Sequence, residues 1–139
     1  MTGTEILNQR SNVIIVGGGP VGVGLAIDLA QRGVSSILIE RRPGMHNIPR
    51  GQNLTQRTLE HFHFWGCVDE VRATRLMPRT VNSNGIIAFG SLTGEHWFET
   101  KGREIVGDYY FQKNDRMPQY CFETVLRARM SQLPLAQAR

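Results

Sequence analysis

The chain has 139 residues, of which 40% are hydrophobic and 20% are charged, so we expect a folded domain with a hydrophobic core. The net charge is +4, but the basic residues are scattered, with no basic run and no regular aromatic spacing, which argues against nucleic-acid binding. The sequence has neither an apolar run of membrane-spanning length nor a signal-peptide pattern, so we expect a cytoplasmic protein with no membrane contact.

The first predicted elements form a compact βαβ unit. Residues 13–16, VIIV, are a short β-branched apolar run, which is typical of a strand buried on both faces of a parallel sheet. A helix is predicted from Pro20 to Arg32, because its apolar residues recur at helical spacing, proline suits the first turn and Gly33 suits the end. A second buried strand, SILIE, follows at residues 36–40. The crossover is expected to be right-handed.

The later elements are predicted from weaker patterns. Residues 41–53 are rich in proline, glycine and arginine and are expected to form a loop. Helices are predicted at Leu54–Phe64 and Val68–Leu76. Residues 80–112 contain short apolar or aromatic pieces between glycine-rich turns, which predicts an antiparallel excursion. The last predicted helix runs from Gln119 to Leu133.

Three glycines between the first strand and the first helix are the main functional signal. Gly17, Gly19 and Gly22 form the pattern G-x-G-x-x-G directly after a predicted strand and at the start of a helix. Gly17 allows a tight turn, Gly19 lets a pyrophosphate approach the backbone, and Gly22 lets the helix pack against the strand. The pyrophosphate would then meet free N–H groups and the positive end of the helix dipole. The alternative is an ordinary glycine-rich turn.

Glu40 ends the second predicted strand and lies 21 residues after Gly19, near the spacing expected for the acid of a dinucleotide site. Its carboxylate can accept hydrogen bonds from the ribose hydroxyls of adenosine. A carboxylate repels a 2′-phosphate, which disfavours NADP, whereas Arg41 and Arg42 could bind that phosphate. From the residues alone, the choice between NAD and FAD stays open.

Three segments in this order resemble the N-terminal part of the FAD-dependent aromatic hydroxylases, the single-component flavoprotein monooxygenases. They are VIIVGGGPVGVGLAIDLAQRGVSSILIERRPG, IPRGQNLTQRTLEHFHFWG and MPQYCFETVLRARM, and the similarity runs from about residue 12 to residue 133. The resemblance implies FAD as cofactor, NAD(P)H as co-substrate, and hydroxylation of a small phenol-like aromatic substrate with O2. A non-catalytic dinucleotide-binding module and another flavin oxidoreductase of the same fold are the alternatives.

The resemblance also implies a role for individual residues. Glu40 would bind the adenosine ribose, and Arg41 would flank the adenine. Arg50 matches a family arginine that reaches the phosphate and ribityl region of the flavin, although Gly51 follows it where the family often has alanine. Gln119 matches a glutamine that contacts the ribityl chain. The residues that would hold the pyrophosphate are Gly17, Gly19, Pro20, Val21 and Gly22.

The resemblance assigns the chain to an α/β fold, a Rossmann-like FAD-binding βαβ unit with a small antiparallel excursion. Residues 1–79 would form the FAD-binding βαβ unit and its helices. Residues 80–115 would begin a sheet like that of the substrate domain, and residues 116–139 would form the return helix of the FAD-binding domain.

Family members are longer than this chain and have a second flavin motif, a Gly-Asp pair before a strand-rich substrate domain. Gly107-Asp108 precedes the last predicted helix, so the motif is not assigned to it. The final residues, LAQAR, provide no apolar run for the strand that should follow that helix. We therefore expect a truncated domain that lacks a C-terminal part of the same enzyme, and we assign no catalytic residue.

Cysteine and histidine give no sign of a metal site. Cys67 and Cys121 form no spaced metal or redox motif and are predicted to be buried thiols. His61 and His63 are two residues apart on a predicted helix, so they point to different faces.

Overall fold

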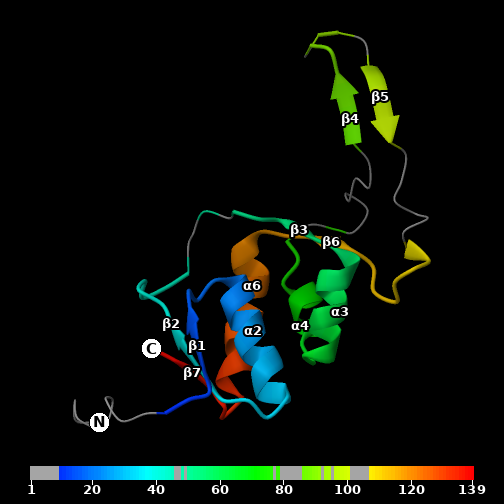
Figure 1. Cartoon of the computed structure of the whole chain (residues 1–139). Coiled ribbons are helices and arrows are strands. Elements are labelled where there is room, and N and C mark those ends of the chain that lie inside the picture. Colours follow the sequence, from blue (N-terminus) through cyan, green and yellow to red (C-terminus); the bar gives the residue numbers. More distant parts are fainter. Residues whose placement is uncertain are drawn as a thin grey trace.

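The computed structural model describes residues 10–45, 48, 50–76, 78, 86–91, 93–94, 96–100 and 107–139. In chain order the elements are β1 (Val13–Val16), α2 (Pro20–Gln31), β2 (Ser36–Ile39), β3 (Asn53–Leu54), α3 (Gln56–Phe64), α4 (Val68–Ala73), β4 (Ile86–Phe89), β5 (His96–Thr100), β6 (Asp115–Arg116), α6 (Gln119–Ser131) and β7 (Ala136–Ala138). Figure 1 shows β1, β2 and β7 side by side, with α2 and α6 packed together next to them. The mixed α/β fold predicted from the sequence is confirmed.

The parallel sheet has the strand order β1-β2-β7, with Ile15 opposite Leu38 across the first pair. The prediction that the last residues provide no strand is wrong, because β7 pairs in parallel with β2. Backbone groups make this pairing: Ser36 N–H donates to Leu135 O at 2.8 Å, and Arg139 N–H donates to Leu38 O at 2.8 Å. An apolar run is therefore unnecessary at this edge of the sheet.

Helix α2 begins and ends close to its predicted limits. Pro20 occupies its first turn, where a missing N–H costs nothing. The helix ends at Gln31, and Gly33 follows with a φ of +78°, a conformation that favours glycine. Its buried side chains pack against the sheet and α6 in a core that includes Ile15, Val23, Ala26, Ile27, Leu38, Leu126 and Met130.

One prediction about β1 is wrong. Ile15 is 6% exposed, but Ile14 is 65% and Val16 is 86% exposed, so the strand is buried on one face only. Successive side chains of a strand point to opposite faces, and α2 packs on the face to which Ile15 belongs. On the opposite face, no element among the described residues buries Ile14 and Val16 as α2 buries Ile15.

The helices after residue 50 start or end a few residues away from their predicted limits. Leu54 belongs to β3, which pairs antiparallel with β6. Thr55 caps α3, because its hydroxyl accepts a hydrogen bond from Thr58 N–H at 3.2 Å. Helix α4 ends at Ala73 and α6 ends at Ser131, each before its predicted end.

The antiparallel excursion predicted at residues 80–112 is confirmed in its described part. Strands β4 and β5 pair antiparallel, with an irregularity between Ala88 and Phe89. Residues 79–85, 92, 95 and 101–106 lie outside the described part of the chain. The three predicted domain limits stay a prediction.

Both cysteines are free thiols in the core, as predicted. Burial raises the pKa of the Cys67 thiol to about 11, so this group is neutral near pH 7. Within the described ranges, no group of three potential metal ligands is found. No helix among them is long and apolar enough to cross a membrane.

Candidate dinucleotide-binding site

The glycine-rich turn joins the end of β1 to the start of α2. Gly17 has a φ of +106°, and its N–H donates to Ile39 O at 2.8 Å, which ties the turn to the end of β2. A Cβ atom on Gly22 would lie only 2.0 Å from Gly17 O. The first turn of α2 therefore closes directly on the glycine turn. Glycine is needed at position 17 for the backbone angle and at position 22 for the close contact.

Gly19 is the N-cap residue of α2 and faces open space. A Cβ atom there would meet no atom within 4 Å, apart from the chain neighbours. Val23 N–H is bonded to Gly19 O at 3.0 Å, whereas the N–H groups of Val21 and Gly22 precede the first helical hydrogen bond and lie at the helix mouth. An open concavity with N–H donors and the positive end of a helix dipole fits a diphosphate.

Glu40 lies beside this turn and is already oriented by the backbone. One carboxylate oxygen accepts from Arg42 N–H at 2.9 Å, and the other accepts from Gly18 N–H at 2.7 Å. The hydrogen bond from Arg42 N–H, followed by that from Gly18 N–H, lowers the pKa of Glu40 below its ordinary value of 4.5. An ionised carboxylate accepts several hydrogen bonds, so Glu40 can still accept from sugar hydroxyls.

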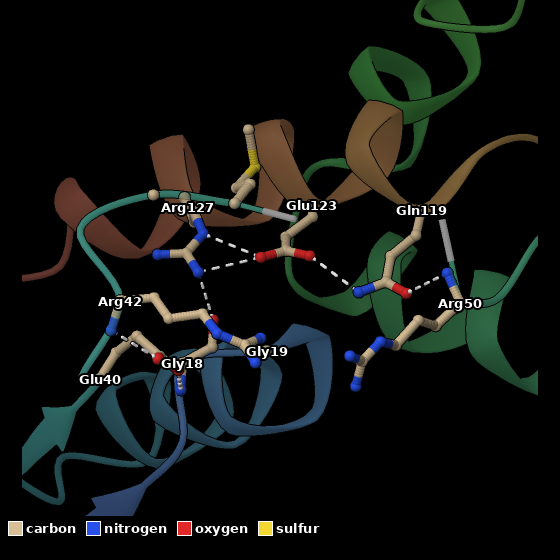
Figure 2. Close-up of a pocket in the computed structure, with 10 residues that line it drawn as sticks. Gly18, Gly19, Glu40, Arg42, Arg50, Gln119, Glu123 and Arg127 are labelled. Carbon is tan, nitrogen blue, oxygen red and sulfur yellow. Dashed lines mark hydrogen bonds and ion pairs between the residues drawn. The ribbon is translucent and has the colours of Figure 1, made fainter. Parts of the chain in front are cut away.

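Helix α6 contributes a row of polar side chains at intervals of four residues, which places them on one face. Glu123 accepts from Arg127 Nε at 3.1 Å and from Arg127 Nη2 at 2.9 Å. Its second oxygen accepts from Gln119 Nε2 at 3.0 Å. Gln119 Oε1 in turn accepts from Arg50 N–H at 3.3 Å, so the row connects to the loop before α3 (Figure 2).

These groups line one cleft with a volume of about 170 Å³. Figure 2 shows the glycine turn and the end of β2 on one side, α6 on the other, and the Arg50 side chain extending into the space between Gly19 and Gln119. Four of the sequence-predicted residues meet here although they come from distant segments. The lining residues are Gly18, Gly19, Glu40, Arg42, Gly44, Met45, Arg50, Gln119, Glu123 and Arg127.

Five predicted residues lie outside this cleft. Arg41 is exposed and does not line it, whereas Arg42 does. The other four border a second hollow, which also includes the exposed apolar residues of β1 and α2 and which shares Gly19 with the cleft. They are Gly17, Pro20, Val21 and Gly22.

Sequence reasoning missed two polar residues of the cleft, Glu123 and Arg127, and it considered Arg42 only as a partner for a 2′-phosphate. The i, i+4 spacing from Gln119 through Glu123 to Arg127 was a usable signal, because it puts an acid and a base on the face that begins with the predicted glutamine. Three guanidinium groups outnumber two carboxylates in this lining, so the cleft suits an anionic ligand.

Residues 10–139 match the model of a family described as an FAD binding domain. The chain is 38% identical over 86 residues to 3-(3-hydroxy-phenyl)propionate/3-hydroxycinnamic acid hydroxylase of Mycobacterium sp. strain JLS. The matched segment covers 62% of this chain and 14% of that protein. The chain is 40% identical over 63 residues to aklavinone 12-hydroxylase DnrF of Streptomyces peucetius, covering 45% of this chain and 13% of that protein.

Two solved structures share the fold of this chain. The flavin-dependent monooxygenase PieE, crystallised with FAD and substrate, superposes with a TM-score of 0.77 at 28% identity, covering 95% of this chain and 24% of that one. The structure of p-nitrophenol 4-monooxygenase PnpA from Pseudomonas putida DLL-E4 shares the fold with a TM-score of 0.70 at 21% identity. The chain thus spans a small part of the proteins it matches.

Proposed function

Because this chain belongs to the FAD binding domain family, we propose that it is the N-terminal FAD-binding part of a flavin-dependent monooxygenase that hydroxylates a phenol-like aromatic substrate with NAD(P)H and O2. Relatives that are hydroxylases and a flavin-dependent monooxygenase of similar structure support this proposal. The main structural support is the cleft where Gly19, Glu40, Arg50 and Gln119 meet.

The residues of this chain have distinct tasks in the proposed complex. The diphosphate of FAD would accept hydrogen bonds from the N–H groups of Val21 and Gly22 at the mouth of α2. Glu40 would accept hydrogen bonds from the ribose hydroxyls, and its charge would exclude a 2′-phosphate. Arg50 and Gln119 would hold the phosphate and ribityl region, since a guanidinium binds phosphate and an amide both donates to and accepts from hydroxyls.

FAD, when bound, supplies the redox and oxygen chemistry, and the protein supplies binding and orientation. We assign no catalytic residue among the described residues. We further propose a C-terminal part of the same enzyme as the partner that recognises the aromatic substrate, because the relatives extend far beyond the region they share with this chain. A cytoplasmic location belongs to the same proposal.

Ligand titration of the purified chain tests the cofactor. We expect quenching of FAD fluorescence and weaker binding of FMN and NAD, because neither of these ligands combines a diphosphate with a ribityl chain. Equal affinity for FAD and ADP would favour a non-catalytic nucleotide-binding module.

The hydroxylase activity needs a second experiment, in which the chain is produced together with any coding sequence that continues it. We expect a yellow protein that oxidises NAD(P)H faster when a phenol is added and that releases a hydroxylated product. A yellow protein that releases no hydroxylated product from any phenol tested would favour another flavin oxidoreductase.

A further inference from the structure

We propose that Glu123 and Arg127 are positioning residues that hold the glycine turn and Gln119 in the geometry needed for FAD binding. This inference rests on the proposed function, because it concerns the same cleft. It adds two residues of α6 that do not belong to the glycine motif and that the sequence resemblance did not assign.

The first step concerns the Gly18–Gly19 peptide. Arg127 Nη2 donates a hydrogen bond to Gly18 O, across 109 positions of the sequence. In a planar trans peptide the C=O and the following N–H point in opposite directions. By holding the carbonyl of Gly18, Arg127 therefore sets the direction of Gly19 N–H at the mouth of α2.

The second step concerns Gly18 itself, to which the G-x-G-x-x-G pattern assigns no role. Its N–H donates to Glu40 at 2.7 Å, so the two backbone groups of this residue are bound by side chains from two distant segments. A Cβ atom on Gly18 would lie 2.8 Å from Glu40 Cβ. Glycine at position 18, the middle one of the three consecutive glycines, thus permits the close approach of Glu40, and Arg127 fixes the other side of the same residue.

The third step concerns the orientation of Gln119. Glu123 is 4% exposed, and its ionised carboxylate only accepts hydrogen bonds. It binds the amide nitrogen of Gln119 at 3.0 Å, so the amide oxygen turns toward Arg50 N–H and the cleft. Arg127 balances the charge of this buried carboxylate. The pair therefore orients the glycine turn and the amide together.

Arg129 provides a matched control on the same helix. Its Nε donates to a backbone carbonyl, Trp65 O, at 2.7 Å, but it does not line the cleft. Arg129→Met and Arg127→Met each remove one guanidinium bond to a backbone carbonyl, and only the second change affects the glycine turn. If the role of Arg127 is purely structural, both variants should have the same affinity for FAD.

The experiment measures the Kd for FAD by fluorescence quenching and the midpoint of thermal unfolding, for wild type, Arg127→Met, Arg127→Lys, Glu123→Gln and Arg129→Met. We expect Arg127→Met to weaken FAD binding by about 10- to 100-fold, the effect of losing a hydrogen bond to a charged group. Arg129→Met should bind FAD like wild type, and it should lose less thermal stability than Arg127→Met, because Arg127→Met also leaves the buried Glu123 without its ion-pair partner. Arg127→Lys should restore part of the affinity.

The outcomes separate this inference from the proposed function. A wild-type chain that binds no FAD would overturn both. A wild-type chain that binds FAD, with equal affinities for Arg127→Met and Arg129→Met, would overturn the positioning role alone. If Arg127→Met does not fold, the isosteric Glu123→Gln decides the matter: about tenfold weaker FAD binding supports the inference, and wild-type affinity overturns it.

Discussion

Two glycines of the turn offer a test that separates folding from ligand binding. In Gly22→Ala the new Cβ would lie 2.0 Å from Gly17 O and 3.3 Å from Ile15 Cγ2. In Gly19→Ala the new Cβ would meet no atom within 4 Å, and the φ of −75° is one that alanine adopts freely. The first change therefore strains the fold, and the second fills only the space in front of the helix.

The magnitudes follow from these contacts. A Cβ atom rarely approaches an oxygen more closely than 3.0 Å, so α2 must move by about 1 Å relative to the turn in Gly22→Ala. The obstructing atom belongs to the backbone and is hard to displace, so we expect a loss of about 2–3 kcal/mol in the free energy of unfolding. Gly19→Ala should stay within about 0.5 kcal/mol of wild type or gain slightly from lower entropy of the unfolded chain.

The assay combines urea unfolding, followed by circular dichroism, with FAD titration under native conditions. We expect Gly19→Ala to unfold like wild type but to bind FAD at least about tenfold more weakly, because its methyl group occupies space that the diphosphate needs. Gly22→Ala should unfold at lower urea. Wild-type stability for Gly22→Ala, or unchanged FAD binding for Gly19→Ala, would refute this account of the turn.

Three further predictions concern polar groups. Backbone hydrogen bonds lower the pKa of Glu40 below 4.5, so its stabilising contribution is complete above pH 4.5 and is lost as the pH falls through the lowered value. Urea midpoints measured across this acid range should fall more in wild type than in Glu40→Gln, which keeps only the acid dependence of other carboxylates such as Asp28. The carboxylate of Asp115 is 3% exposed and paired with Arg75, so Asp115→Ala should lower the free energy of unfolding by about 3–5 kcal/mol, whereas an Arg75→Met/Asp115→Leu double variant loses less. Thr55→Ala should cost about 1 kcal/mol in urea unfolding by removing the cap of α3, and Thr55→Ser should retain most of it.

Local signals in the sequence predict the βαβ unit and its glycine-rich turn. Strand, turn and helix lie within a short stretch, and each is specified by local requirements: apolar runs for the strands, Pro20 for the helix start, and glycine where φ is +106° at Gly17. The spacing of Glu40 from the glycines follows from the lengths of the helix and strand between them. Local signals suffice here because neighbours in sequence make these structures.

Which side chains meet across the cleft depends on how distant elements pack together. Arg50 and Gln119 are 69 positions apart and come together because β3, which follows Arg50, pairs with β6, which precedes Gln119. The packing of α6 against α2 brings Arg127 to Gly18. Arg42, and not Arg41, lines the same cleft, which the sequence did not distinguish. Similarly, β7 forms from a weakly apolar segment because β2 presents a free edge of backbone donors and acceptors. No periodicity in the sequence specifies such contacts, since they depend on the arrangement of distant elements.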